Sequence, residues 1–247
     1  MLTLVIPAYT GGENIERTMK SSQAWDEMVI ISTAVFEDDH EHFMSLTPKV
    51  VRLDWNYVFL HGFGSMSNCG TAAAKNDWLV LLGVAETLAE EHGDLHRRLQ
   101  DARPHSMFRC DHHGDHHTWK RIWNRRGGTH WSGIIHEEIT GGNTDDILFR
   151  MQDTPKVATT DEFRQDVFRH IKALTYNWLY SELLLRPERL GATNPGWLNF
   201  VNGARESITA FIALHREMMD ACILGDLETF LELVRRSREV ISPIPAY

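Results

Sequence analysis

Apolar runs alternate with stretches of helical spacing in the amino-terminal half of the chain, and this alternation limits the folds available to it. Residues 2–8 form an unbroken apolar run, and Ile15 and Met19 follow it four residues apart, as on one face of a helix. Residues 28–32 and 49–53 are two further β-rich runs, separated by an acidic stretch that suits an exposed helix. The repeated order predicts an α/β fold with a mostly parallel, doubly wound, Rossmann-like sheet.

A further apolar run, at residues 78–82, leads into the short turn 83–86, Gly-Val-Ala-Glu. The preceding residues 65–74 are rich in small side chains and predict a helix packed closely on the sheet. In open α/β sheets, ligands bind at the carboxyl ends of the strands, where loops and helix amino termini converge. The turn is therefore a candidate binding site, and Glu86 is its ionisable side chain.

The spacing of apolar residues changes near residue 155. Strands expected at 107–110 and 119–123, joined by a polar hairpin loop at 111–117, complete the first region. Beyond it, apolar residues recur at steps of three and four in two helical series: Phe163, Val167, Ile171, Leu174 and Trp178, then Ile208, Phe211, Ile212 and Met219. A last helix is expected at 227–240. We therefore expect an α/β domain over residues 1–155 and an α-helical carboxyl-terminal extension over 156–247.

Composition and charge narrow the class of protein. A chain of 247 residues with 43% hydrophobic content can bury one sizeable core and a smaller one. Its cysteines, Cys69, Cys110 and Cys222, lack a paired spacing, which argues against a disulfide framework or a zinc ribbon and predicts a cytoplasmic location. No signal peptide and no membrane span are expected. The net charge of -9 favours a nucleotide-sized ligand over a long nucleic-acid groove.

Two segments carry a resemblance to the family 2 glycosyltransferases. Residues 77–86, Asp-Trp-Leu-Val-Leu-Leu-Gly-Val-Ala-Glu, resemble the strand and Asp-x-Asp segment of that family, and residues 120–139 resemble its acceptor-side segment, which often ends in His-Glu. The resemblance implies the A-type nucleotide-sugar fold and a hexosyltransferase-like enzyme. Such an enzyme moves a sugar from a nucleoside diphosphate sugar, with a UDP-sugar favoured, to an acceptor hydroxyl with inversion. Gly83 and Ala85 stand where its aspartates are expected, so the Asp-x-Asp motif is degenerate.

The same resemblance implies a set of donor-binding residues. Pro7 ends the first strand, Tyr9 is expected to pack on the nucleotide base, and Gly64 is expected to let a loop approach the diphosphate. An ordinary strand-end turn near Tyr9, and a helix cap at Ser65 or Ser67, are the simpler alternatives. The expected donor-binding residues are Pro7, Tyr9, Glu13, Gly64, Asn68, Glu86 and Arg125.

Metal binding and catalysis are expected from neighbouring acids. In an Asp-x-Asp site, carboxylates hold a divalent cation that bridges the diphosphate. Glu86 and His136 are the candidate metal ligands here, and because one carboxylate and one imidazole make a poor magnesium site, we expect Mn²⁺ or Mg²⁺ binding to be weak or absent. Glu137 is the first candidate for the general base that deprotonates the acceptor, and Glu138 is the second. The alternative is that both glutamates are surface carboxylates.

A basic, tryptophan-rich segment follows the hairpin: Trp119, Lys120, Arg121, Trp123, Arg125, Arg126 and Trp131. This combination suits phosphate neutralisation with stacking on a sugar or base. We expect Arg125 to contact the donor, and Trp123 and Trp131 to contact the acceptor. Half-buried tryptophans with basic neighbours that reach the solvent are the alternative.

Other functions stay open. A binding module that keeps the nucleotide-sugar fold without catalysis would explain the missing aspartates, and the basic tryptophan-rich segment motivates an enzyme acting on a modified nucleic-acid base. His112, His113, His116 and His117 lie in the predicted loop, where adventitious metal binding is favoured over the built site of a metal-dependent hydrolase. The sequence specifies neither the sugar, nor the acceptor, nor the oligomeric state.

Overall fold

The structure of the protein is a computed structural model that describes residues 1–10, 13–20, 25–88, 92–112, 118–153, 161–190 and 195–237. By the contacts among their residues, the described parts form two compact units. The first unit takes the described residues within 1–53, 66–132 and 138–157, and the second takes those within 54–65, 133–137 and 158–247.

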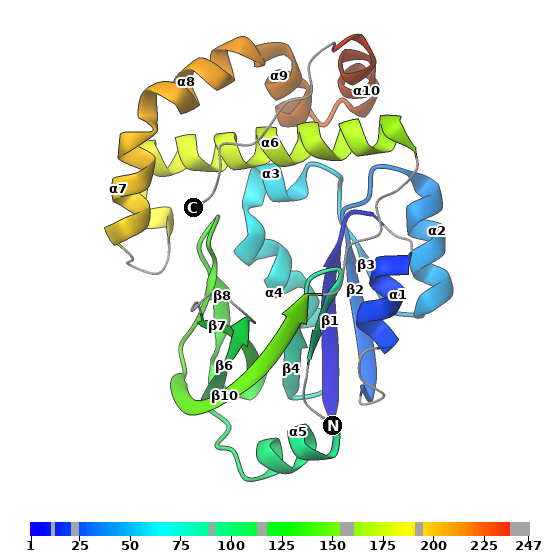
Figure 1. Ribbon diagram of the computed structural model, residues 1–247, viewed down its shortest axis with the longest axis vertical. Helices are drawn as coiled ribbons and strands as arrows, with labels where there is room; N and C mark the ends of the chain where they lie inside the picture. Colours follow the sequence, from blue (N-terminus) through cyan, green and yellow to red (C-terminus); the bar gives the residue numbers. More distant parts are fainter. Residues whose placement is uncertain are drawn as a thin grey trace. The chain divides into compact units, whose positions relative to one another are not determined.

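The first unit is built on an eight-stranded sheet with the strand order β3-β2-β1-β4-β7-β6-β10-β5 (Figure 1). Six of these strands run in one direction, while β5 and β7 run against them, so the predicted mostly parallel α/β sheet is confirmed. A separate pair, β8 and β9, is antiparallel. The bounds are β1 (Leu2–Ala8), β2 (Glu27–Ser32), β3 (Val50–Arg52), β4 (Trp78–Leu81), β5 (Glu86–Leu88), β6 (Ser106–His112), β7 (Thr118–Asn124), β8 (His130–Ser132), β9 (Glu138–Thr140) and β10 (Asn143–Asp153).

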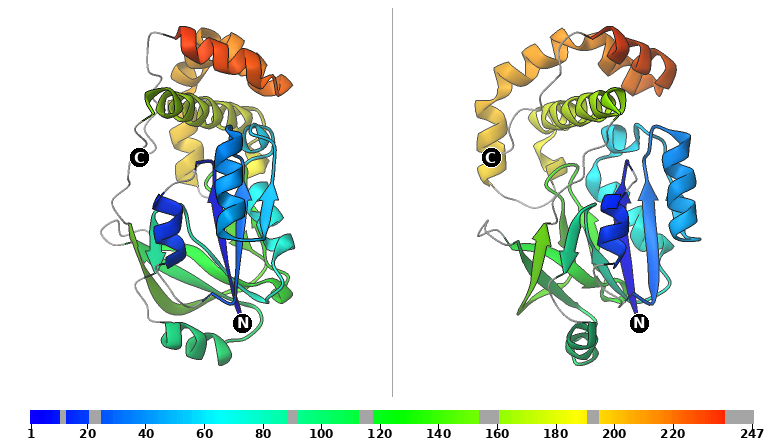
Figure 2. Two further views of the ribbon diagram at one scale, coloured as in Figure 1. Left: turned by 90° about the vertical axis from the view of Figure 1, so that its right-hand side faces the viewer. Right: turned by 45° about the vertical axis from the view of Figure 1, so that its right-hand side comes forward.

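Helices cover both faces of this sheet. Leu4 of β1 belongs to one buried cluster with Ile15 and Phe43, which come from two helices on the same face. On the other face, a Cβ built on Gly70 would lie 2.7 Å from Cγ1 of Val5, so a helix backbone lies directly on the strand there, as expected for residues 65–74. Figure 2 shows α1 and α4 on opposite sides of β1. The helical bounds are α1 (Glu13–Lys20), α2 (Glu37–Leu46), α4 (Phe63–Ala73), α5 (His92–Gln100) and the 3₁₀ turn η1 (Arg125–Gly127).

The acidic helix α2 is less exposed than expected. The imidazole of His40 is buried, with Nδ1 2.7 Å from Ser32 Oγ and Nε2 3.1 Å from the carbonyl oxygen of Ala34. These contacts bind the helix to the end of β2, and burial of the ring lowers the pKa of His40. Hydrophobic spacing does not reveal this contact, because it is made by polar groups.

The sequence did not predict strands β5 and β10. The turn at 83–86 connects β4 in the middle of the sheet to β5 at its edge, where Met151 to Asp153 of β10 pair with Leu88 to Glu86. The long strand β10 lies between β6 and β5 and pairs with each along a different edge, and its register with β6 shifts between Asp145 and Leu148.

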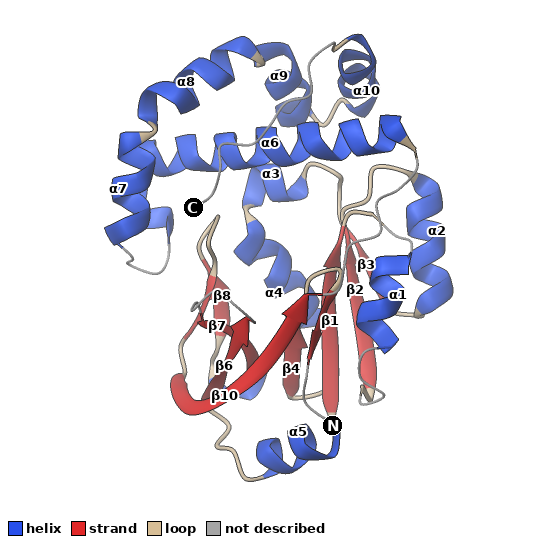
Figure 3. Cartoon of the chain, viewed as in Figure 1, coloured by secondary structure: helices blue, strands red, loops and turns tan. Residues whose placement is uncertain are grey.

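The regular elements among the second unit's described residues are all helices, so the predicted helical carboxyl-terminal region is confirmed (Figure 3). Ile134 and Ile135 pack with Leu179, Tyr180 and Leu183 in its buried cluster. Asp161 caps its longest helix by accepting a hydrogen bond from the backbone nitrogen of Arg164 at 3.1 Å. Its helices are α3 (Tyr57–His61), α6 (Glu162–Leu185), α7 (Pro195–Gly203), α8 (Arg205–Leu214), α9 (Arg216–Leu224), α10 (Leu227–Arg236) and the 3₁₀ turn η2 (Pro187–Leu190). None of the described helices is long and apolar enough to cross a membrane.

One detail of the expected helical region was wrong. The second apolar series forms two helices, α8 and α9, which break at His215, instead of one long helix. The segments 54–65 and 133–137 group with the helical unit although both lie before the expected boundary at residue 155. The loop at 113–117, with three of the four clustered histidines, and the last residues of the helix expected at 227–240 lie outside the described residues.

Candidate functional site

The carboxyl ends of β1 and β4 form the candidate binding edge of the first unit. β1 ends at Ala8 and is followed by Tyr9, whose side chain is 52% exposed, while Pro7 is partly buried within the strand. β4 ends at Leu81 and leads into the turn at 83–86. Because β1 and β4 pair in parallel, both loops lie at the same edge of the sheet. Glu13 begins α1 after the first of these loops, and its side chain lies outside the described residues.

The turn at 83–86 is held by its own carboxylate. The backbone nitrogen of Glu86 donates to the carbonyl oxygen of Gly83 at 3.0 Å, and the Glu86 side chain turns back, so that Oε2 accepts from the backbone nitrogen of Gly83 at 2.5 Å. Ala85 is buried in the left-handed region with φ 75°, a conformation that costs a residue with a Cβ about 1 kcal/mol. Thr18 of α1 holds this residue, since its Oγ1 accepts from the backbone nitrogen of Ala85 at 2.9 Å.

Arg121 supplies the positive charge at this turn. Val80 of β4 pairs with Ile122 of the antiparallel strand β7, so Arg121 lies beside the carboxyl end of β4. Its Nη2 is 3.7 Å from Oε1 of Glu86, and both side chains are only 17% exposed. A guanidinium and a carboxylate at this depth attract each other more strongly than a pair on the open surface. The turn therefore presents an arginine that is held in place by an acid.

The geometry of this turn does not fit a divalent cation. Mg²⁺ and Mn²⁺ bind several oxygen ligands, usually including carboxylates. Glu86 is the turn's one carboxylate, it already accepts from Gly83, and the Arg121 guanidinium lies beside it, where it would repel a bound cation. A Cβ built on Gly83 would lie 3.2 Å from Cδ and Oε2 of Glu86, so the carboxylate fills the space that a side chain at position 83 would need. Among the described residues, no group of three or more metal-ligating side chains is assembled.

The expected metal ligand His136 belongs to the second unit, and its pairing with Glu86 of the first unit stays a prediction. Its Nε2 lies 3.0 Å from the hydroxyl oxygen of Tyr180 on α6, and its backbone has φ 52°. Burial lowers the pKa of His136 to about 4, and burial also raises the pKa of Tyr180. His136 is therefore neutral at pH 7 and hydrogen-bonded to a neutral phenol.

The two candidate bases lie in different elements. Glu137 is partly buried at the end of the segment Gly133–Glu137, in the second unit. Glu138 begins β9 in the first unit, where its carboxylate lies 3.7 Å from the amine of Lys120 and is 43% exposed. The Lys120 amine also donates to the carbonyl oxygen of Ile139 at 3.3 Å, so this lysine is held against β9. Their roles as bases stay predictions.

The structure does not bring Arg125 to the candidate binding edge. β7 runs against β4, so the end of β7 returns to the amino end of β4, and the backbone nitrogen of Arg125 donates to the carbonyl oxygen of Asp77 there at 2.9 Å. The guanidinium donates to the carbonyl oxygens of Ala74 and Lys75, just beyond α4. Arg125 therefore lies at the opposite edge of the sheet from Tyr9 and Glu86, where it caps a helix end.

Trp123 and Trp131 are core residues, which corrects their expected acceptor role. Trp123 is fully buried and Trp131 is 4% exposed. Their rings pack edge to face, with centroids 5.3 Å apart and planes at 90°. Neither ring is available to stack on a sugar or a base. The tryptophan-rich segment consequently offers little support for the alternative of a nucleic-acid-base enzyme.

The residues expected around the glycine-containing loop are inside a helix. Gly64 is buried within α4, and since this helix begins at Phe63, Ser65 and Ser67 are interior residues and do not cap it. The side-chain amide of Asn68 makes two hydrogen bonds with the backbone of Trp131. Its Nδ2 donates to the carbonyl oxygen at 2.8 Å, and its Oδ1 accepts from the backbone nitrogen at 2.9 Å. This double hydrogen bond fixes β8 and explains the asparagine without a ligand.

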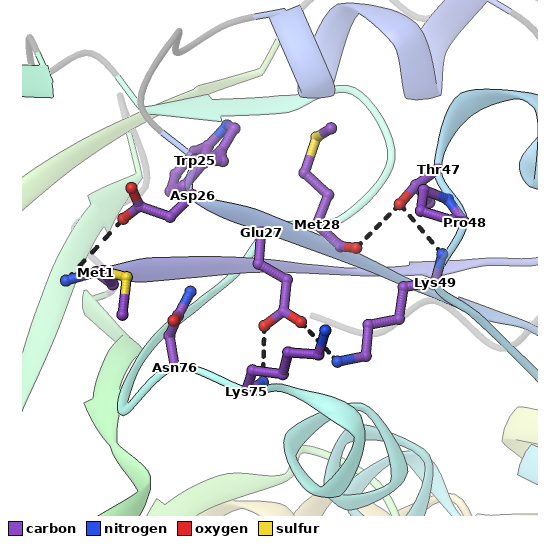
Figure 4. Close-up of a pocket in the computed structure, with 10 residues that line it drawn as sticks. All are labelled: Met1, Trp25, Asp26, Glu27, Met28, Thr47, Pro48, Lys49, Lys75 and Asn76. Atoms are coloured by element: carbon purple, nitrogen blue, oxygen red, sulfur yellow. Dashed lines mark hydrogen bonds and ion pairs between the residues drawn. The ribbon is translucent and has the colours of Figure 1, made fainter.

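A cavity of about 600 Å³ lies at the amino ends of β1 and β2, opposite the candidate edge (Figure 4). Glu27 dominates its polar wall and accepts from Lys49 Nζ at 2.5 Å and from Thr3 Oγ1 and the backbone nitrogen of Lys75 at 2.7 Å each. Burial alone would raise the pKa of Glu27, but these hydrogen bonds lower it to about 2. The carboxylate is therefore a structural charge that binds three segments together.

Sequence reasoning missed the role of Arg121, although it noted the basic segment that contains it. Alternation along β7 does not single out this arginine. Its importance follows from the antiparallel pairing of β7 with β4, which sends Arg121 and Arg125 to opposite edges of the sheet. The sequence contains one indication of a basic partner. The turn lacks both expected aspartates but keeps the acid Glu86, which a positively charged side chain can pair with.

No family model and no curated protein matches the chain. Among solved structures, it is similar to S. aureus TarS at 11% identity, over 96% of this chain and 55% of that one, with a TM-score of 0.42. A TarS 1–349 structure in complex with UDP-GlcNAc also matches, at 11% identity, 95% and 90% coverage and a TM-score of 0.43. Glucosyl-3-phosphoglycerate synthase from Mycobacterium tuberculosis, in complex with Mg²⁺ and UDP, matches at 16% identity, 46% and 44% coverage and a TM-score of 0.35.

The chain spans about half the length of the full TarS chain, and the part of it that matches the synthase covers under half of that protein. All three TM-scores are below 0.5, so neither a function nor a residue role is transferred from these proteins.

Proposed function

We propose that the protein is a glycosyltransferase that binds a nucleoside diphosphate sugar, with a UDP-sugar favoured, at the carboxyl edge of β1 and β4. The observation that carries the proposal is the turn at 83–86. A segment that resembles the Asp-x-Asp region forms a strained turn at the carboxyl end of a central parallel strand, with a partly buried acid and arginine. Left-handed non-glycine residues are concentrated at ligand sites.

The proposed donor site uses residues of the first unit. Tyr9 is half-exposed directly after β1, where a base can pack on it, and Pro7 lies near the end of that strand. The diphosphate lies near the turn, where the Arg121 guanidinium is held by Glu86. A planar guanidinium matches phosphate oxygens through two parallel hydrogen bonds.

The proposed reaction is an inverting displacement. Glu137, or Glu138 as the second candidate, removes the proton from an acceptor hydroxyl while the hydroxyl oxygen forms a bond to the anomeric carbon. The bond between that carbon and the diphosphate oxygen breaks, and the nucleoside diphosphate leaves with the electron pair on the opposite face. Neutral His136 next to Glu137 in sequence, hydrogen-bonded to Tyr180, would fix the backbone that carries the base.

The experiment is a ligand panel followed by turnover. Thermal shift and calorimetry with UDP, GDP, CDP and their common sugars should reveal binding of at least one donor, and donor hydrolysis or transfer should then be detected. Glu137→Gln should abolish turnover while donor affinity is kept, and Glu138→Gln should have the smaller effect. Failure of every nucleotide and nucleotide sugar to bind, with and without metal, rejects the proposal.

A non-catalytic nucleotide-sugar-binding module is the second candidate. It is supported by the turn itself, in which Glu86 is tied to Gly83 and Arg121 and the positions of the expected aspartates carry no acid. This candidate predicts nucleotide binding with no hydrolysis and no transfer under any metal condition. It also predicts that Glu137→Gln leaves every measurable property except stability unchanged.

A further inference from the structure

We propose that the guanidinium of Arg121 takes the place of the divalent cation, so that the protein binds its donor's diphosphate without a metal. This inference rests on the proposed function, because it concerns the same nucleotide. It differs from the function expected from the resemblance, in which carboxylates hold a cation at this turn.

The first support is the position of the charge. Arg121 lies beside the carboxyl end of β4, and its Nη2 is 3.7 Å from Glu86 Oε1. A cation held by a carboxylate of this turn would lie next to that same glutamate. The guanidinium therefore brings one positive charge to the region where the resemblance expects two, and it offers hydrogen bonds that a spherical ion lacks.

The second support is that Glu86 is arranged to hold an arginine. Its Oε2 accepts from the backbone nitrogen of Gly83, which fixes the carboxylate against the turn, and its Oε1 faces Arg121. Both side chains are 17% exposed, so the solvent screens the pair only in part. A side chain held in this way loses less conformational entropy when it binds a phosphate than a free surface arginine would.

The third support is steric. A side chain at position 83 would meet the Glu86 carboxylate at 3.2 Å, so Gly83 and the inward-turned Glu86 depend on each other. Ala85, the other position where an aspartate is expected, is fully buried. The turn is therefore built around one acid, Glu86, and one arginine, Arg121. In the proposal, the Arg121 guanidinium supplies the positive charge that a cation held by two aspartates would otherwise supply.

The test is calorimetric titration of the full chain with UDP after exhaustive treatment with EDTA, repeated with added Mg²⁺ and Mn²⁺. Wild type should bind UDP in EDTA, with an affinity that changes by less than about twofold on addition of metal. Arg121→Ala should weaken binding by about tenfold or more, since a charge-assisted hydrogen bond to phosphate is lost, and Arg121→Lys should fall between them. Circular dichroism checks that each variant is folded.

Two further variants keep the result interpretable. Arg52→Ala removes another arginine that pairs with a carboxylate, Glu37, on the exposed surface of the same unit, and it should leave UDP affinity unchanged. Glu86→Gln can still accept from Gly83 but no longer attracts a cation. If Arg121 provides the charge, Glu86→Gln still binds UDP in EDTA, and more tightly than Arg121→Ala, although Arg121 is held less firmly. A metal-holding Glu86 would instead make this variant lose the binding that added metal supports.

The outcomes separate this inference from the proposed function. UDP binding that requires Mn²⁺ or Mg²⁺ and is lost in Glu86→Gln overturns the inference and leaves the function standing. Equal UDP binding by wild type and Arg121→Ala overturns it as well. If no nucleotide binds to wild type in any condition, the proposed function fails, and the inference fails with it.

Discussion

The Nε2 atom of His136 lies 3.0 Å from the hydroxyl oxygen of Tyr180, and this hydrogen bond ties the segment Gly133–Glu137 to the carboxyl-terminal part of α6. Burial keeps the imidazole neutral at pH 7 and raises the pKa of the phenol, so the contact is a neutral hydrogen bond. It stabilises a backbone in which His136 adopts φ 52°, immediately before the candidate base Glu137.

His136 should make stability fall with acid between pH 6.5 and pH 4. Its folded-state pKa of about 4 lies below the ordinary value, so in this window the unfolded chain binds a proton that the folded chain does not. The loss reaches about 3 kcal/mol at most by the usual conversion of a pKa shift. In urea unfolding across this range, His136→Gln should be less stable than wild type at pH 7, and the difference should shrink toward pH 4.

His130→Gln is the control, since His130 is exposed. Its stability should follow wild type across the same pH range. If His136→Gln also gives a curve parallel to wild type, the histidine is protonated in the folded protein and its burial has no energetic effect.

Glu27 should stabilise the protein above pH 4.5 and lose this effect as the pH falls toward 2. Its folded-state pKa of about 2 is lower than that of an unfolded glutamate, because Lys49, Lys75 and Thr3 donate hydrogen bonds to the carboxylate. Glu27→Gln should cost up to about 3 kcal/mol at pH 7 and almost nothing near pH 2. Chemical unfolding at both pH values measures the difference.

Glu37→Gln serves as the comparison for Glu27, because Glu37 makes its ion pair with Arg52 on the exposed surface. It should leave stability unchanged. Glu27→Gln should also leave UDP affinity unaltered, because Glu27 lies at the amino edge of the sheet. A loss of UDP affinity without a loss of stability would place the nucleotide in the amino-edge cavity instead.

Arg125→Ala should destabilise the protein without weakening donor binding. Its guanidinium donates to the carbonyl oxygens of Ala74 and Lys75, so its removal leaves two carbonyl groups beyond α4 without this donor and should cost about 1–3 kcal/mol. The neighbouring Arg126, whose side chain is 75% exposed, provides a matched alanine control with little effect. Thermal unfolding and UDP titration of both variants decide whether Arg125 belongs to the fold or to the site.

Gly62→Ala should be among the most damaging changes in the second unit. Gly62 joins α3 to α4 with φ 83° and ψ 168°, a region open almost exclusively to glycine, and a Cβ there would lie 2.5 Å from Cα of Ile134. We expect a loss of about 3 kcal/mol or more in the free energy of unfolding, from strain and overlap together.

Gly225→Ala separates these two causes. Gly225 ends α9 with φ 70°, and its nearest neighbour would be Asn56 Nδ2 at an ordinary 3.4 Å, so only the backbone strain of about 1–2 kcal/mol is expected. Equal losses in the two glycine variants would show that the overlap with Ile134 is relieved by movement of the segment Gly133–Glu137.

Hydrophobic spacing predicted the parts of the fold that burial controls. The unbroken apolar run of β1 and the small residues that let Gly70 lie against Val5 are visible in the sequence, because each is a local consequence of packing on the sheet. Strands β5 and β10 and the grouping of residues 54–65 and 133–137 with the helices depend on long-range pairing, which local spacing does not encode. The break between α8 and α9 at His215 has no glycine or proline that would predict it from the sequence.

The sequence predicted where the candidate turn lies in the fold better than it predicted which side chains lie beside it. The turn after β4 was identified from the carboxyl-end rule, and Glu86 lies in it. Arg125, Trp123 and Trp131 were chosen by residue type, which does not reveal strand direction or burial. Arg121 was passed over because the pairing of β7 with β4, unlike periodicity, is set by contacts about forty residues apart.

A Cβ at position 83 would lie 3.2 Å from the Glu86 carboxylate, so an aspartate there requires the glutamate side chain to shift away from the turn. Gly83→Asp would force two acids together beside a single arginine, and removal of Arg121 alone would leave a half-buried acid without its counter-charge. Conversion to a two-aspartate cation site therefore requires substitutions at positions 83 and 85 together with the loss of the Arg121 charge. Chains that carry only one of these changes should be less stable than either end state.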